Sequence, residues 1–177
     1  MKWNVSLCAS AMFAAFASCP VYADASAASV ITNFDDFPLT AYPGAALIEH
    51  DGFTITETTS WLSLRIDDAS IPGGSIKGRW LNITPTSKPA LVVLKLPDQT
   101  KVKSLSFEFA SQFEGSDKVG VTCKYANGAE STEVLLPFGH AKELCAHVRG
   151  TTVAALQFRL PNGNGSRRLS IDNLVSP

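Results

Sequence analysis

The feature that most constrains the fold of this chain is an alternation of apolar and polar residues with a period of two. Leu105, Phe107 and Phe109 show it most clearly, because a polar residue precedes each of them. Successive side chains of a strand point to opposite faces of a sheet, so each such segment predicts a β-strand with one buried face. The predicted strands span 30–34, 52–57, 61–66, 81–85, 90–96, 102–110, 119–125, 130–136, 153–160 and 168–175.

The spacing of these segments predicts the fold class. Many short strands separated by turn signals are typical of an all-β protein, here an antiparallel β-sandwich of two sheets. Asn127-Gly128 lies between two predicted strands and predicts a type I′ hairpin turn. A doubly wound parallel sheet would need amphipathic helices, and the one candidate for a helical turn is Ala141 to His147. We therefore expect a single β-sandwich domain over residues 30–177.

The first 23 residues are typical of a secretory signal peptide. Lys2 is followed by an apolar run from Val5 to Phe16, and Val21-Tyr22-Ala23 predicts cleavage before Asp24. Residues 24–29 are then a flexible start to a secreted or periplasmic protein. The alternative is a lipoprotein leader, in which Cys19 is acylated and becomes the first mature residue. Mass spectrometry of the mature amino terminus distinguishes the two.

Charge and hydropathy exclude two classes of partner. Removing Lys2 lowers the basic count from 15 to 14 against 16 acidic residues, which leaves a mature net charge of −2. No basic stripe is present to follow a nucleic-acid backbone, so a nucleic-acid partner is disfavoured. After the leader, no apolar run approaches the roughly 18 residues that a transmembrane helix needs. The sequence leaves the oligomeric state open.

Two cysteines remain after the leader removes Cys8 and Cys19. Cys123 and Cys145 would then lie in an oxidising compartment, where a disulfide between them is favoured. Closing a loop of this length stabilises a fold by roughly 3 kcal/mol in the chain-entropy model. The alternative is a pair of buried thiols that pack as small apolar side chains.

Carboxylates stand near both ends of the mature chain. Asp35 and Asp36 follow the first predicted strand, and Asp172 lies in the last one. Leu174 is out of phase with the apolar residues before Asp172, which predicts a β-bulge there. If the first and last strands are neighbours, these three carboxylates could bind calcium, which prefers oxygen ligands. The alternative is that Asp172 accepts backbone hydrogen bonds at the bulge.

Three short motifs carry a family resemblance. Phe-Asp-Asp at 34–36, Leu-Ser-Phe-Glu-Phe at 105–109 and Ile-Asp-Asn-Leu at 171–174 resemble secreted bacterial jelly-roll domains. These domains are similar to galactose-binding-like and carbohydrate-binding modules. The resemblance implies a jelly roll, glycan binding and a structural calcium between the first and last strands, with Asp35 or Asp36 and Asp172 as ligands.

Aromatic residues are the candidates for contact with a sugar, because a pyranose ring has an apolar face edged by hydroxyls. Trp80 is out of phase with the core residues that follow it and has Arg79 and Asn82 beside it. Trp61, at the start of another predicted strand, is the second candidate. For both tryptophans the alternative is packing at the edge of the core.

Three functional classes stay open. The first is a non-catalytic module that recognises extracellular or cell-envelope carbohydrate. The second is a structural or adhesive envelope protein that binds another protein. The third is a small polysaccharide-degrading enzyme, for which the sequence offers no catalytic residues, because neither Gly-x-Ser-x-Gly nor His-Glu-x-x-His occurs. We take the first class as the working hypothesis.

Overall fold

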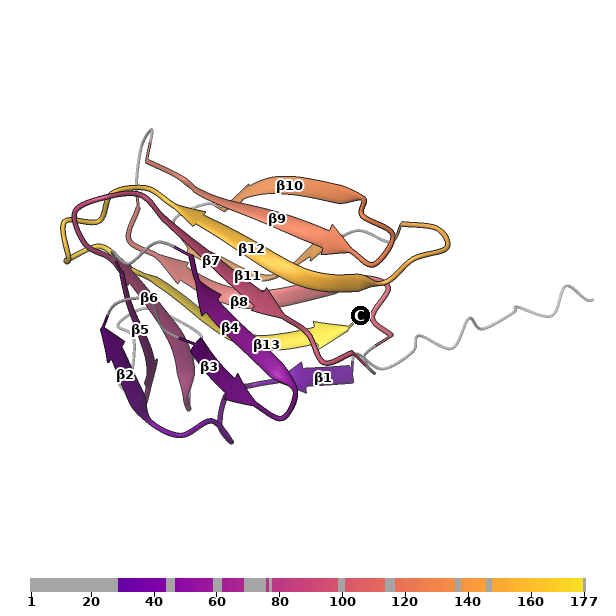
Figure 1. Ribbon diagram of the computed structural model, residues 1–177, viewed down its shortest axis with the longest axis horizontal. Helices are drawn as coiled ribbons and strands as arrows, with labels where there is room; N and C mark the ends of the chain where they lie inside the picture. The colour runs from indigo at the N-terminus through magenta and orange to yellow at the C-terminus, as the bar shows by residue number, and fades with distance from the viewer. Residues whose placement is uncertain are drawn as a thin grey trace, which may run out of the picture.

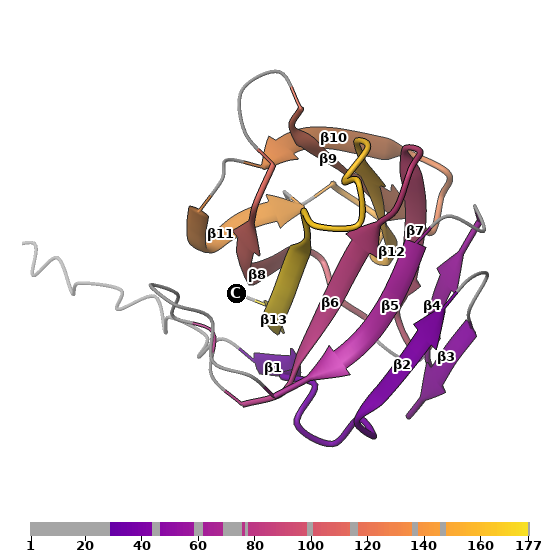
Figure 2. The same ribbon diagram turned by 90° about the vertical axis from the view of Figure 1, so that its left-hand side faces the viewer.

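The computed structural model describes residues 29–43, 47–58, 62–68, 76, 78–98, 101–113, 117–135, 138–145 and 148–176. These residues form two antiparallel sheets packed face to face (Figures 1 and 2). Sheet A runs in the order β11 (Phe138–Cys145), β8 (Leu105–Ser111), β13 (Leu169–Ser176), β6 (Trp80–Pro85), β5 (Leu62–Asp67) and β2 (Thr40–Pro43), with β1 (Ser29–Thr32) also paired to β13. Sheet B runs in the order β10 (Glu130–Leu135), β9 (Val119–Tyr125), β12 (Val153–Leu160), β7 (Ala90–Lys95), β4 (Phe53–Glu57) and β3 (Leu47–His50).

The order of the last eight strands defines a jelly roll. From β6 to β9 the chain passes to the other sheet at every step, and after the β9–β10 hairpin it alternates again from β11 to β13. The resulting orders, β6-β13-β8-β11 and β7-β12-β9-β10, are those of two four-stranded sheets joined by Greek-key connections. Strands β5 and β4 extend the two sheets in the same way. The predicted all-β jelly-roll sandwich is confirmed.

The core lies between the sheets and is built by the predicted alternation. Leu105, Phe107 and Phe109 of β8 all point inward and are at most 5% exposed. Phe107 meets Phe158 of sheet B edge to face, with ring centroids 5.8 Å apart. This arrangement favours the aromatic quadrupoles and buries both rings completely. A single apolar layer therefore holds the two sheets together.

The predicted disulfide is present and crosses this core. Cys123 lies on β9 of sheet B and Cys145 at the end of β11 of sheet A, with Cα atoms 5.7 Å apart. Both cysteines are at most 1% exposed. The bond therefore joins the two sheets directly.

The two ends of the described chain are neighbours, as the sequence predicted. β1 pairs antiparallel with the end of β13, with Val30 opposite Val175. The predicted bulge is also present, because the register of β13 against β8 shifts after Asp172, and Asn173 has a φ of 48°. The bulge returns Leu174 to the core, where it is fully buried.

Two local predictions are wrong. The segment from Ala141, the one candidate for a helical turn, forms part of β11 up to Cys145 instead, because pairing with β8 supplies its backbone hydrogen bonds. Within Asn127-Gly128 only Gly128 has a positive φ, 84°, so the turn is not type I′. The side chain of Asn127 instead accepts a hydrogen bond from the Ala129 N–H at 3.0 Å. Asp51 and Gly52, with φ of 48° and 81°, are the pair whose positive φ values a type I′ turn requires.

Candidate functional site

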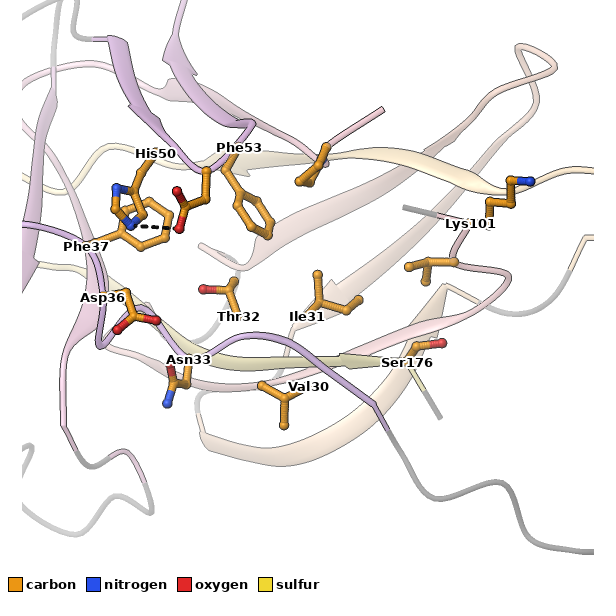
Figure 3. A pocket seen from close by; sticks show the side chains of 13 residues that line it. Val30, Ile31, Thr32, Asn33, Asp36, Phe37, His50, Phe53, Lys101 and Ser176 are labelled. Carbon is orange, nitrogen blue, oxygen red and sulfur yellow. Dashed lines mark ion pairs between the residues drawn. The ribbon is translucent and has the colours of Figure 1, made fainter. Parts of the chain in front are cut away.

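A pocket opens at one end of the sandwich, where β1 of sheet A faces the β3–β4 turn of sheet B (Figure 3). Its volume is about 690 Å³, within the range of about 300–1,000 Å³ usual for small-ligand sites. We call it the end pocket. Its lining residues are Val30, Ile31, Thr32, Asn33, Asp36, Phe37, His50, Asp51, Phe53, Pro97, Lys101, Val102 and Ser176.

An aromatic cluster supports the end pocket from below. Phe37 is 1% exposed and packs against Phe53, with ring centroids 6.0 Å apart, and against Phe34 at 5.1 Å. The imidazole of His50 lies over Phe37 at 4.5 Å. Because the three phenylalanine rings belong to the core, the base that they give the pocket is rigid and apolar.

Polar groups surround this apolar wall. His50 Nε2 lies 3.3 Å from Asp51 Oδ2, within ion-pair distance but not aligned as a hydrogen bond. The carboxylate of Asp36 and the side chain of Lys101 are exposed at the pocket, on opposite sides of it in Figure 3. The end pocket therefore combines an apolar surface with carboxylate, imidazole and ammonium groups that can hydrogen-bond to a ligand.

The loop that carries Asp36 is held in place by Arg79. The Arg79 backbone N–H donates to Asp35 Oδ1 at 2.8 Å, and Arg79 Nη1 donates to the carbonyl oxygens of Asp35 and Phe37 at 3.0 and 2.7 Å. Gly78 has a φ of 85°, and a Cβ there would collide with Asp35 Oδ1. A glycine before Arg79 is thus required for the loop to approach so closely. Asp35 and Arg79 position the loop, and Asp36 faces the pocket.

Local hydrogen bonds shape the same loop from within. Asn33 Oδ1 accepts from the Asp35 N–H at 3.2 Å, and Asn33 Nδ2 donates to Asp35 Oδ2 at 2.8 Å. Thr32 Oγ1 accepts from the N–H of Phe34, whose φ is 59°. These bonds are of the kind by which Asn and Thr side chains stabilise turns directly after a strand. The turn directs Phe34 and Phe37 into the core and leaves Asp36 outside.

The structure places the four predicted sugar-contact residues away from the end pocket. Trp80 is 1% exposed and packs with Ile76 and Ala110 on the outer side of sheet A. The Arg168 guanidinium lies 5.8 Å from the centroid of its ring, within range of a cation–π interaction. The Trp80 ring is therefore not open to a ligand in this conformation.

The other three residues of that prediction have different locations. Asn82 is 3% exposed and accepts a hydrogen bond from Thr84 Oγ1 at 3.3 Å. Arg79 holds the loop over residues 33–37, as described above. Trp61 lies outside the described residues. A sugar-binding role for these residues stays a prediction.

The predicted calcium ligands do not converge on one point. Asp35 uses both carboxylate oxygens for protein N–H groups, and Asp36 faces the end pocket. Asp172 is fully buried and accepts the Asn173 N–H at 2.7 Å, while Asn173 Nδ2 donates to Glu108 at 3.1 Å. Within the described residues no three His, Cys, Asp or Glu side chains are grouped to hold a metal. These hydrogen bonds are those of the alternative role, at a turn and at a bulge, and calcium binding stays a prediction.

Removing calcium is expected to leave the melting temperature unchanged, because protein N–H groups already satisfy Asp35 and Asp172. Thermal unfolding with added calcium and then with excess chelator measures this. A fall in melting temperature on chelation that calcium reverses would contradict the expectation and support a calcium brace between the chain ends.

Three residues of the end pocket, His50, Asp51 and Lys101, are not among the candidates that the sequence pattern indicates. The sequence does contain a pattern that marks the position of His50 and Asp51. Asp51-Gly52 lies between segments of alternating apolar and polar residues, which is a strong hairpin signal. That signal indicates a turn, although it does not indicate which other segments the turn faces. No local pattern marks Lys101, which reaches the pocket from the connection between β7 and β8.

No protein-family model and no curated protein matches this sequence. Similar solved structures include a variant of a family 29 carbohydrate-binding module, which shares 19% identity, with 79% of this chain and 91% of the module aligned at a TM-score of 0.48. Another variant of this module, complexed with mannohexaose, shares 19% identity over 78% of this chain and 92% of its own, also at 0.48. An exo-β-agarase shares 12% identity over 76% of this chain and 25% of its own, again at 0.48.

Proposed function

We propose that this protein is a non-catalytic carbohydrate-recognition module and that the end pocket is its binding site. One observation carries the proposal: a pocket of about 690 Å³ whose inner wall is aromatic and aliphatic and whose rim is polar. The solved modules named above are carbohydrate-binding proteins, but a likeness at such low identity bears on the fold alone. The proposal therefore rests on the pocket.

The composition of the pocket suits a sugar ring. The apolar face of a pyranose would pack on the aliphatic side chains of Val30 and Ile31, which keep exposed surface at the pocket, whereas Phe37 and Phe53 are buried behind the wall. Its hydroxyls would then reach the rim, where Asp36 accepts hydrogen bonds and Lys101 donates them. Because Asp36 projects from a loop that Arg79 holds rigidly, little conformational entropy would be lost on binding.

Replacing Asp36 by alanine is expected to weaken carbohydrate binding about tenfold or more. The reason is that the variant loses one hydrogen bond between the ligand and a charged group. The measurement is binding of the wild type and the variant to a glycan array, followed by calorimetry on the glycans that bind. Asp117→Ala is the matched control, because Asp117 is an exposed carboxylate in the β8–β9 connection, at the opposite end of the strands. This control variant should bind as the wild type does.

Two outcomes would contradict the proposal. A wild-type protein that binds nothing on the array would favour the alternative, an envelope protein with a protein partner. Release of new reducing ends from a bound glycan would show catalysis and revive the enzyme class.

Secretion is part of this proposal and rests on the amino-terminal leader. In the described residues no helix is long and apolar enough to cross a membrane. A carbohydrate-recognition module would meet its ligand outside the cell or in the envelope, which agrees with either form of the leader predicted from the sequence.

A further inference from the structure

A second pocket, of about 610 Å³, opens at the same end of the sandwich as the end pocket. We call it the side pocket. Its lining residues are Lys103, Ala126, Asn127, Gly150, Thr151 and Thr152. Figure 1 shows the β9–β10 turn and the connection into β12, which form it, at the end where β1 begins and β13 finishes.

The walls of the side pocket are tied to each other. The Asn127 N–H donates to Thr151 Oγ1 at 3.2 Å, and the Ala126 N–H donates to the Thr152 carbonyl oxygen at 2.9 Å. Asn127 Oδ1 is occupied by the Ala129 N–H, so the amide nitrogen is the part of this side chain that can donate to a ligand. The two loops therefore form one preorganised, uncharged polar surface beside Lys103.

A three-residue segment separates the two pockets. Lys101 lines the end pocket and Lys103 lines the side pocket. Val102 between them is 5% exposed, and its carbonyl oxygen accepts the Val153 N–H at 2.7 Å, which fixes the segment against the start of β12. Two residues of chain span at most about 7 Å, so the lysine backbones are close together. One lysine therefore lines each pocket, on either side of the anchored residue Val102.

We propose that the end pocket and the side pocket are two subsites of one surface, which binds an oligosaccharide chain across Val102. This inference rests on the proposed function and adds the ligand class, a glycan chain of several sugar units in place of a single sugar or disaccharide. Lys101 donates to the part of the chain in the end pocket. Lys103 and the Asn127 amide donate to the part in the side pocket.

The experiment is calorimetry with two length series, β-1,4-linked glucose and β-1,4-linked mannose oligosaccharides from one to six units, together with the glycan array. For the wild type, affinity is expected to rise about tenfold or more from disaccharide to hexasaccharide. Lys103→Ala should remove most of that gain and leave disaccharide affinity unchanged. Lys118→Ala, an exposed lysine before β9 at the other end of the strands, should behave as the wild type.

The outcomes separate this inference from the proposed function. If short sugars bind and affinity does not rise with length, the end pocket stands and the two-subsite surface is wrong. If Lys103→Ala binds every length as the wild type does, the side pocket plays no part and the inference is also wrong. If no saccharide binds in solution or on the array, the proposed function fails and the inference fails with it.

Discussion

Replacing Phe107 by alanine is expected to lower the free energy of unfolding by about 3–5 kcal/mol. The Phe107 ring is fully buried and meets Phe109 and Phe158, with centroids 6.0 and 5.8 Å away, so its removal leaves a cavity between the two sheets. A typical domain has only about 5–15 kcal/mol of stability, so the variant would lose a large fraction of it. Equilibrium unfolding in denaturant measures the change.

Val134→Ala is the control for this experiment. Val134 lies on the edge strand β10 and is 53% exposed, so its truncation should change stability by no more than about 0.5 kcal/mol. Phe107 does not line the end pocket, and the folded fraction of Phe107→Ala should keep wild-type affinity for carbohydrate. Equal unfolding midpoints for the Phe107 and Val134 variants would contradict the burial of Phe107 between the two sheets.

Removing the disulfide is also expected to lower the stability of the protein by a large amount. The double variant Cys123→Ala/Cys145→Ala is expected to lose roughly 3 kcal/mol of stability, because an open loop of this length has more conformational freedom when unfolded. The sequence separation of the two cysteines is 22 residues. For a domain of this size the loss corresponds to a melting temperature lower by roughly 6–12 °C. Thermal unfolding under oxidising conditions measures it.

The reductant supplies the control. Dithiothreitol should lower the melting temperature of the wild type towards that of the double variant and leave the variant itself unchanged. If the double variant has the same melting temperature as the oxidised wild type, the bond between β9 and β11 contributes nothing to stability.

Alternation was a sound guide to which residues face the core. Leu105, Phe107 and Phe109 all point between the sheets. The slipped phase of Leu174 located a real bulge beside Asp172. These predictions succeed because the two-residue period of a strand is a local property that the order of residues reveals directly.

The same alternation does not predict exposure where other segments cover the outer face of a sheet. The phase of Trp80 places it outside the core of the sandwich, and in the structure it does lie there. Ile76 and Ala110 nevertheless bury it, and Asn82 on the same strand is buried as well. The two-residue period of a strand predicts which face of the sheet a side chain is on. Whether that side chain is exposed depends on the other segments that pack over the same face.

The order of residues predicts a two-layer β-sandwich, the residues that fill its core and a disulfide between Cys123 and Cys145. The order of the strands in the folded chain brings the connections near Asp36, Asp51, Lys101 and Asn127 to one end, where they line two pockets, and no sequence pattern predicts this meeting. The physical reason is that the alternation acts between adjacent residues, while a pocket depends on the register and order of strands that are far apart in the chain.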